Sequence, residues 1–109
     1  MSYYCPDTWV IIHLKGDDPH YRVLAGWNGG YAKGDSWRMN SGITECIEDG
    51  DYWLFIGSSG STYACYKDSY GLRISTVGTW NQLEQKYGDK VELMEDRWDW
   101  NKMDWIITK

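Results

Sequence analysis

The sequence has little of what metal centres, disulfide frameworks and nucleophilic active sites require. Its 109 residues include three cysteines and two histidines. Cys5, Cys46 and Cys65 form no CxxC pair, and their odd number favours reduced thiols over a disulfide framework. Neither His13 nor His20 stands at a zinc-ligand spacing from a cysteine, and no spacing marks either one as the base of a Ser or Cys nucleophile. The sequence therefore predicts no metal and no cofactor, and it favours binding over catalysis.

Phosphate-binding loops and membrane segments are also missing. There is no GxxxxGK[ST] motif, and no GxGxxG stretch opens a helix. No segment approaches the roughly 20 consecutive apolar residues of a membrane helix, and the start "MSYYCPD" has no basic region followed by an apolar run. We therefore expect an unsecreted, cytoplasmic protein that does not contact a membrane.

The chain lacks an excess of basic residues as well. Sixteen acidic residues stand against eleven Lys and Arg, a formal net charge of −5, and the acids gather in "EDGD" and "DKVELMEDRWDW". Such a chain is a poor electrostatic match for phosphate backbones, which disfavours direct nucleic-acid binding. Two interpretations stay open: the acidic surface binds a basic patch on another protein, or it only keeps the protein soluble.

Phenylalanine is nearly absent, because the aromatic content consists of eight Trp and nine Tyr beside one Phe. Trp and Tyr carry polar tips, so they collect at interfaces and binding platforms as well as in cores. The sequence does not separate these two uses. A chain of this length is expected to be one domain, residues 1–109, that buries a core without a metal or a disulfide.

The first expected hairpin spans residues 8–27. β-Branched residues dominate "TWVIIHLK", the turn "GDDP" follows, and "HYRVLAGW" resumes an alternating pattern. This alternation places four side chains on one face: Tyr21, Val23, Ala25 and Trp27.

The second expected hairpin lies in "ITECIEDGDYWLFIG". If the "DG" pair at positions 49 and 50 forms its two-residue loop, Cys46 faces Trp53 and Ile47 faces Tyr52. Both faces of this strand pair are then apolar. Such a pair is either central, with both sides covered, or it presents one side as a contact surface.

The hydrophobic period changes near the C-terminus. Trp80, Leu83 and Tyr87 share one helical stripe, and Gly88 stands where helices commonly end. We expect a helix over residues 79–87, whose stripe could cover one face of the second hairpin. Further strands are expected over residues 62–67, in "DWIIT" and in "LRIS". The predicted fold class is α+β, a mainly antiparallel β-sheet of about five or six strands with one packed helix.

The stretch "GWNGGYAKGDSWRMNSG", residues 26–42, joins the two hairpins and is longer than such a connection needs to be. Long ordered loops are usually functional, and aromatic side chains among hydrogen-bonding groups suit recognition. We expect this loop to bind a partner, with the turn at residues 58–61 beside it; a purely structural role is the alternative. The candidate contacts are aromatic anchors, charged groups and hydrogen-bonding groups: Trp27, Tyr31, Trp37, Arg38, Asp35, Asn28, Asn40 and Ser41.

The segments "GDSWRMNSGI" and "YWLFIGSSGSTYACYKDSYG" resemble stretches of small uncharacterised proteins encoded by tailed bacteriophages, particularly those of marine bacteria. The resemblance covers most of residues 5–71 and carries no functional residue across. It implies an accessory protein that works in an infected cell or in a virion by binding a host or viral protein. Two other functions stay open: a carbohydrate- or small-ligand-binding module, and a structural component of the virion.

Overall fold

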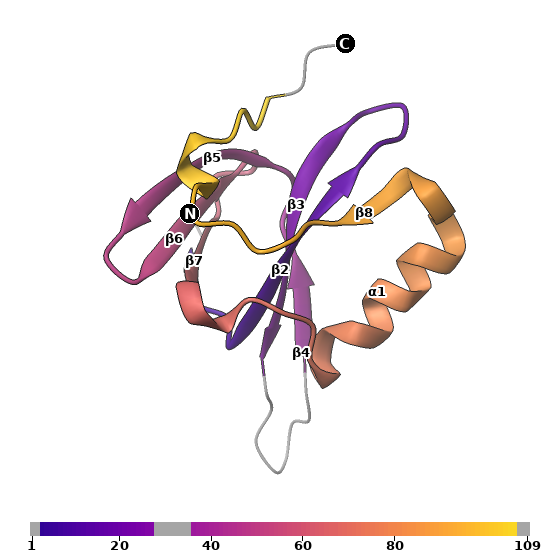
Figure 1. Ribbon diagram of the computed structural model, residues 1–109, viewed down its shortest axis with the longest axis horizontal. Helices are drawn as coiled ribbons and strands as arrows, with labels where there is room; N and C mark the ends of the chain where they lie inside the picture. Colours follow the sequence, from indigo (N-terminus) through magenta and orange to yellow (C-terminus); the bar gives the residue numbers. More distant parts are fainter. Residues whose placement is uncertain (1–2, 28–35, 107–109) are drawn as a thin grey trace.

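The computed structural model describes residues 3–27 and 36–106, which form two four-stranded sheets (Figure 1). Sheet 1 contains, in spatial order, β1 (Tyr3–Tyr4), β7 (Thr62–Tyr66), β6 (Tyr52–Gly57) and β5 (Ile43–Asp49). Sheet 2 contains, in spatial order, β4 (Ser36–Met39), β3 (His20–Trp27), β2 (Thr8–Leu14) and β8 (Val91–Leu93). Neighbouring strands are antiparallel except β1 and β7, which are parallel.

One α-helix, α1 (Ile74–Tyr87), and three 3-10 helices accompany the sheets: η1 (Lys67–Ser69), η2 (Gly88–Lys90) and η3 (Trp100–Lys102). The predicted α+β class, mainly antiparallel with one packed helix, is confirmed. The arrangement differs from the prediction in that the described residues form eight strands in two sheets. The additional strands are short, and β4 lies inside the stretch that was expected to be a loop.

The hairpin of β2 and β3 has the expected form. Trp9 pairs with Ala25, and the pairing continues from Thr8 to Leu14. The predicted face of β3 is confirmed, since Val23 and Ala25 are fully buried in the core between the sheets and the flanking Tyr21 and Trp27 pack against it.

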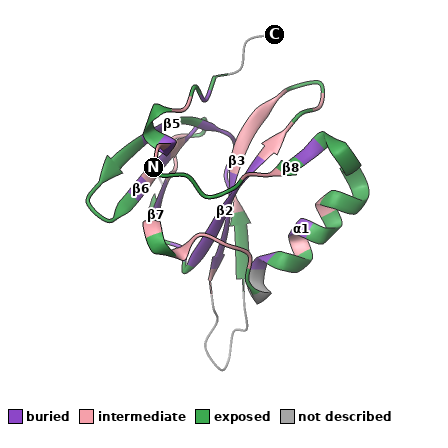
Figure 2. Cartoon of the chain, in the orientation of Figure 1, coloured by how far each residue is buried: buried purple, intermediate pink, exposed green. Residues whose placement is uncertain are grey.

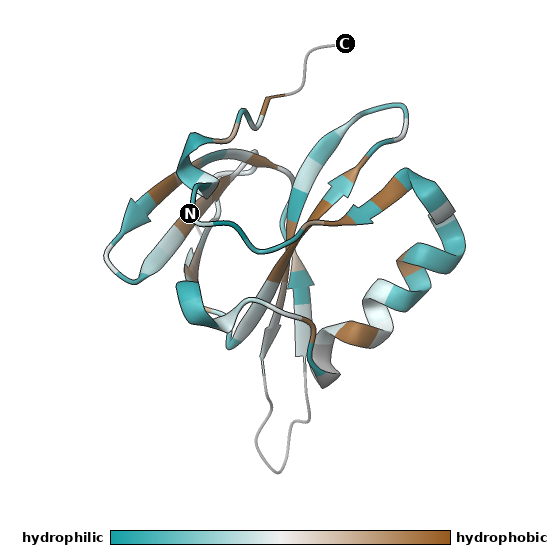
Figure 3. Ribbon diagram, viewed as in Figure 1, coloured by the Kyte–Doolittle hydropathy of each residue, from teal (hydrophilic) through white to brown (hydrophobic). Residues whose placement is uncertain are grey.

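The main core lies between the two sheets and is aromatic. Trp9 from sheet 2 and Phe55 from sheet 1 are fully buried, with ring centroids 5.4 Å apart. Trp100 of η3 packs against both rings at 6.2 Å. Figure 2 shows the buried residues where the sheets face each other, and Figure 3 shows hydrophobic segments at the same central crossing of β2 and β3. Most of the tryptophans therefore serve the interior, and those that are buried are Trp9, Trp53, Trp80, Trp100 and Trp105.

A second, smaller core lies between α1 and the opposite face of sheet 2. Trp80 of α1 is buried there with Ile12 and Leu24, and α1 contacts β3, β4 and β8. In Figure 1 the helix lies on the right, whereas β5 and β6 lie on the left. The expectation that the helix covers a face of the second hairpin is therefore wrong. The apolar stripe of α1 packs instead on one face of β2 and β3. Side chains alternate along these strands, so the residues between those that enter the main core point toward α1.

The loop of the β5–β6 hairpin lies one residue later than predicted. Cys46 pairs with Phe55, not with Trp53, and the turn consists of Gly50 and Asp51. Gly50 has a φ of 60°, and no described residue other than glycine has a positive φ. Glycine first and an ordinary residue second is the pattern of a type II′ turn. The predicted loop is therefore wrong by one residue and each predicted pair by two, which leaves Trp53 and Phe55 on one face and Tyr52 and Leu54 on the other.

The helix begins earlier than its apolar stripe indicates, at Ile74. The hydroxyl of buried Thr76 accepts a hydrogen bond from the backbone N–H of Arg73 at 3.1 Å and so caps the first turn. At the other end Gly88, with a φ of 58°, donates its N–H to the carbonyl of Glu84, so the predicted C-terminal glycine is confirmed. The strand expected in "LRIS" is wrong, because its last two residues belong to this helix.

Candidate functional site

Part of the Gly-rich stretch is strand. β3 continues through Trp27, and β4 pairs with it so that Trp37 lies opposite Gly26 and Arg38 opposite Ala25. The expectation of a loop is therefore wrong for residues 36–39. Three candidate contacts, Asn28, Tyr31 and Asp35, lie outside the described residues.

Trp37 and Arg38 point to opposite faces of β4, since side chains alternate along a strand. Trp37 is on the α1 side of sheet 2 and is 50% exposed. Arg38 is on the sheet 1 side, where its guanidinium carbon lies 4.6 Å from the centre of the Tyr4 ring. Trp27 shares that side, and its indole N–H donates to the carbonyl of Cys5 at 3.0 Å. Trp37 thus points to the opposite face from Trp27 and Arg38, although all three residues line one hollow.

Asn40 is in the interior, with 3% of its surface exposed. Its Oδ1 accepts a hydrogen bond from the backbone N–H of Val23 at 2.8 Å, which makes it a structural residue. Ser41 is exposed, and its hydroxyl accepts hydrogen bonds from the Ser58 hydroxyl at 2.9 Å and the Ser59 N–H at 3.0 Å. The expected proximity of the 58–61 turn is confirmed for this end of the stretch.

A more continuous surface is the face of sheet 1 turned away from sheet 2. Along β6 the side chains of Trp53 and Phe55 enter the core, so Tyr52, Leu54 and Ile56 point outward. Their neighbours across the sheet are also apolar, because Ile47 pairs with Leu54 and Tyr66 with Tyr52. We call this set the outer apolar face: Ile47, Tyr52, Leu54, Ile56 and Tyr66.

The outer apolar face is accessible and partly aromatic. Ile47, Tyr52 and Tyr66 are 44%, 37% and 38% exposed. The two tyrosine rings meet edge-to-face with centroids 5.5 Å apart. Figure 2 colours most of β5 as exposed. These side chains are held by a sheet, so their geometry does not depend on a loop.

The charges on this face are of one sign. Glu45 pairs with Ile56 and Asp49 with Tyr52, so both carboxylates share the outward side. The strands β5, β6 and β7 contain no Lys or Arg. Lys67 follows β7, but its ammonium pairs with Glu48 and lies 4.6 Å from the centre of the Trp53 ring, on the other side of the sheet. Neither Glu45 nor Asp49 forms an ion pair within the described part of the chain, so acid borders the outer apolar face.

The two histidines lie in different surroundings. His13 stacks on Tyr21 with ring centroids 4.4 Å apart, and its Nδ1 is 3.5 Å from a carboxylate oxygen of Glu92. His20 lines a pocket that also contains serines, but both ring nitrogens are occupied: Nδ1 bonds the Asp18 carbonyl at 2.6 Å, and Nε2 accepts from Arg22 Nε at 2.9 Å. In this arrangement His20 has no nitrogen with which to activate a serine hydroxyl.

The cysteines are free, and two of them are buried. Burial, reinforced by the nearby carboxylates of Glu48 and Glu45, raises the pKa of the Cys46 thiol from about 9 to about 12. Burial also raises the pKa of Cys65 well above its usual range. The thiolate is the reactive form of cysteine, so neither thiol acts as a nucleophile near neutral pH.

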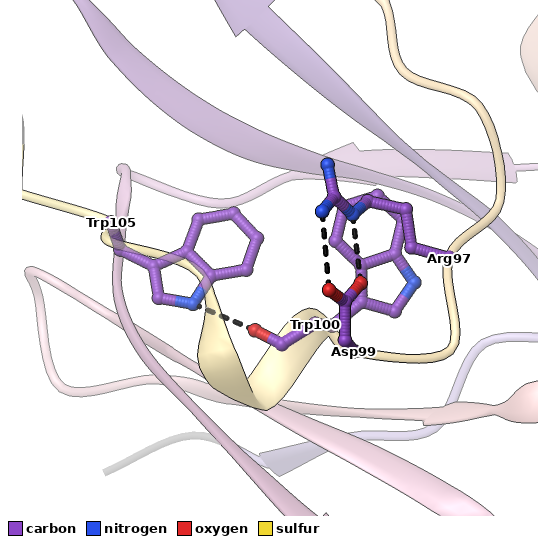
Figure 4. A network of polar contacts seen from close by, with 4 residues as sticks. All are labelled: Arg97, Asp99, Trp100 and Trp105. Atoms are coloured by element: carbon purple, nitrogen blue, oxygen red, sulfur yellow. Dashed lines mark hydrogen bonds and ion pairs between the residues drawn. The ribbon is translucent and has the colours of Figure 1, made fainter.

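The C-terminal segment closes the core and makes no strand over residues 104–106, so the strand expected in "DWIIT" is wrong for its described part. Figure 4 shows the indole N–H of Trp105 donating to the Trp100 carbonyl, at 3.1 Å. Beside it Arg97 Nε donates to a carboxylate oxygen of Asp99 at 2.9 Å. This hydrogen bond lowers the pKa of Asp99, the residue that precedes η3.

Within residues 3–27 and 36–106 no three His, Cys, Asp or Glu side chains gather closely enough to hold a metal ion. The same residues contain no helix with the length and apolarity needed to cross a bilayer. Comparison with protein families, with curated proteins and with solved structures found no match to this chain.

Proposed function

We propose that the protein is a non-catalytic binding domain whose outer apolar face docks a basic surface of a partner protein. The observation that carries this proposal is the placement of exposed Ile47 and Tyr52 beside the carboxylates of Glu45 and Asp49, all on one side of sheet 1. Large exposed apolar patches rimmed by polar groups commonly mark interaction sites. Tyrosines at the centre of such a patch supply much of the contact energy in many interfaces.

The charges decide which kind of partner fits. A second copy of this chain, stacked on the same face, would bring the Glu45 and Asp49 carboxylates of the two copies into one interface without a basic residue to balance them. Like charges across an interface are unfavourable. A partner with Lys or Arg around an apolar centre complements both the exposed apolar side chains and the carboxylates beside them. The resemblance to small phage proteins would make that partner a host or viral protein in the cytoplasm of the infected cell.

The test compares charge-reversed variants in affinity capture from a bacterial lysate. In the first variant Glu45 and Asp49 are both changed to Lys. The matched control carries the same change at Glu84 and Asp89, two exposed acids of α1 and η2. A protein retained by the wild type and by the control, lost from the first variant, and bound less tightly as salt rises is the expected result. Equal retention or equal loss in both variants would contradict the proposal.

Carbohydrate binding is the second candidate function. The aromatic side chain on which a sugar ring would stack is Trp98, which lies outside the Gly-rich stretch. This indole is 77% exposed, with the Lys102 ammonium 5.2 Å from its ring centre. It borders a hollow of about 550 Å³ that Glu48, Asp96 and Arg97 also line. Aromatic faces beside polar groups suit sugar rings. Quenching of Trp fluorescence by an oligosaccharide, lost in Trp98→Ala, is the expected sign, and silence across a broad panel removes this function.

A further inference from the structure

We infer a second binding site, for a small molecule that carries an oxyanion, at the open edge of β3. The site is a pocket of about 270 Å³ between the turn that precedes β3, the start of β5 and the C-terminal segment. It lies outside the set of residues that forms the outer apolar face, so it does not depend on the function proposed above. Its polar lining includes Arg22, His20, Ser41, Thr44 and Ser58.

Among residues 3–27 and 36–106, no strand pairs with this edge of β3, because β4 does not reach it. β4 pairs only with residues 24–27 of β3, and the next pairing position is taken by Asn40, which bonds both the N–H and the carbonyl of Val23. Backbone groups two residues apart point to the same side of a strand. The N–H and carbonyl of Tyr21 therefore face the same edge as those of Val23, beside the pocket that Arg22 and His20 line.

Arg22 is the residue that points to an anion. Its Nε donates to His20 Nε2 at 2.9 Å, and Nδ1 of the same ring donates to the Asp18 carbonyl at 2.6 Å. This chain of two hydrogen bonds orients the guanidinium. The two terminal nitrogens of Arg22 have no partner among the described residues. A guanidinium held in this way can bind a carboxylate or phosphate end-on through both terminal nitrogens.

Arg22 differs from the other three described arginines in burial, because it is half-buried and they are exposed. Arg97 pairs with Asp99, Arg38 stacks on Tyr4, and Arg73 donates to a backbone carbonyl. Arg22 is half-buried in a chain of net charge −5, yet it has no ion pair with any described carboxylate. An uncompensated, partly buried cation in an acidic protein is costly unless a ligand completes it.

The other residues that line the pocket indicate what the ligand carries besides its oxyanion. The hydroxyls of Ser58 and Ser41 are 2.9 Å apart and can rotate to donate to a ligand oxygen. The buried indole of Trp105 and the side chain of Ile43 offer an apolar wall for an organic body. Asp18 also lines the pocket, and its carboxylate opposes an anion, so Asp18→Asn is expected to tighten binding.

The test is a titration of the isotope-labelled full chain, followed by amide and Arg22 Nε–H NMR shifts. The probes are benzoate and phenyl phosphate, with benzyl alcohol as the uncharged control and chloride keeping the ionic strength constant. We expect saturable shifts at Gly42 and Thr44 with at least one anionic probe and none with benzyl alcohol. A response to benzoate alone assigns a carboxylate ligand, and a response to phenyl phosphate alone assigns a phosphate ester.

Arg22→Gln should weaken the responding probe by about tenfold or more, because the bidentate contact is lost, whereas Arg97→Gln should leave its affinity unchanged. Should Arg22→Gln fail to fold, Arg22→Lys decides, since it keeps the charge without the planar fork and should still weaken the probe. Absence of saturable shifts with both anions, or equal affinity in the Arg22 and Arg97 variants, would overturn the inference.

Discussion

Asn40 and Val23 are joined by two hydrogen bonds: the Asn40 N–H donates to the Val23 carbonyl at 3.1 Å, and the Val23 N–H donates to Asn40 Oδ1 at 2.8 Å. The side-chain amide thus takes the place of a backbone carbonyl and extends the β3–β4 pairing by one position. β4 ends at Met39, and the chain is free to cross from sheet 2 to sheet 1. Asn40 was predicted to contact a partner. In the structure it bonds the edge of sheet 2 at the point where the chain leaves for sheet 1.

Asn40→Ala should destabilise the fold, because it leaves the buried N–H of Val23 without an acceptor. The expected loss in the free energy of unfolding is about 1–3 kcal/mol. Asn40 Nδ2 has no partner in the wild type, and losing that buried donor offsets part of the cost. Urea unfolding measures the difference, with exposed Asn101→Ala as the control. A midpoint equal to that of the control would show that the amide is not structural.

The turn assignment of the β5–β6 hairpin is tested by Gly50→Ala. Gly50 has a φ of 60°, in the left-handed region where an alanine costs about 1–2 kcal/mol. Gly16 also lies in a hairpin turn, but its φ is outside that region and nothing lies within 4 Å of an added Cβ. Gly16→Ala is therefore expected to be neutral or slightly stabilising. Equal thermal unfolding midpoints for the two variants would contradict the assigned turn.

Several strands and the helix could be predicted from the sequence, but the sheet on which the helix packs could not. The β2–β3 hairpin was predictable, because strict alternation separates one buried face from the other. The start of α1 was not, since β-branched Thr76 and Val77 and the neighbouring Gly78 are weak helix formers. The Thr76 cap and the burial of Trp80 against sheet 2 supply the stability that propensity does not. Which sheet the helix covers depends on tertiary packing that local patterns do not carry.

Tyr70→Phe should destabilise the junction between β2 and the segment after β8. The Tyr70 hydroxyl accepts a hydrogen bond from the Ile11 N–H at 3.2 Å and donates to the Met94 carbonyl. Removing it leaves both backbone groups short of a partner, at an expected cost of about 1–3 kcal/mol in chemical unfolding. Tyr87→Phe, at an exposed position, is the matched control. A Tyr70 variant as stable as this control would show that the hydroxyl is dispensable.

Alkaline pH should destabilise the fold through Cys46. Burial raises its pKa from about 9 in the unfolded chain to about 12, so the folded state holds the thiol proton more tightly. This contribution is complete below about pH 9 and is lost as the pH rises toward 12. Urea unfolding at about pH 8 and about pH 10.5 measures the loss, which Cys46→Ala should reduce. An unchanged loss in that variant would assign the effect to other buried groups.

The surface proposed for partner binding lies on the second hairpin, whereas the sequence pointed first to the loop before it. Two apolar faces on residues 43–56 predicted either burial on both sides or one open face, and the structure leaves the Ile47 and Tyr52 side exposed. The Gly-rich stretch has a composition that suits recognition. Composition does not reveal that Trp37 and Arg38 are neighbours in a strand and therefore point to opposite faces. That placement depends on β3 extending far enough to pair with them.

The central claim is that the outer apolar face of sheet 1 binds a basic partner protein. Its most direct test is the NMR footprint of the captured, purified partner on the labelled chain, compared between the wild type and Ile47→Lys. We predict that amide shifts concentrate on β5, β6 and β7, and that Ile47→Lys weakens affinity by about tenfold or more, as for a central apolar contact. A footprint centred on α1 or β4, or an affinity that Ile47→Lys leaves unchanged, would contradict the claim.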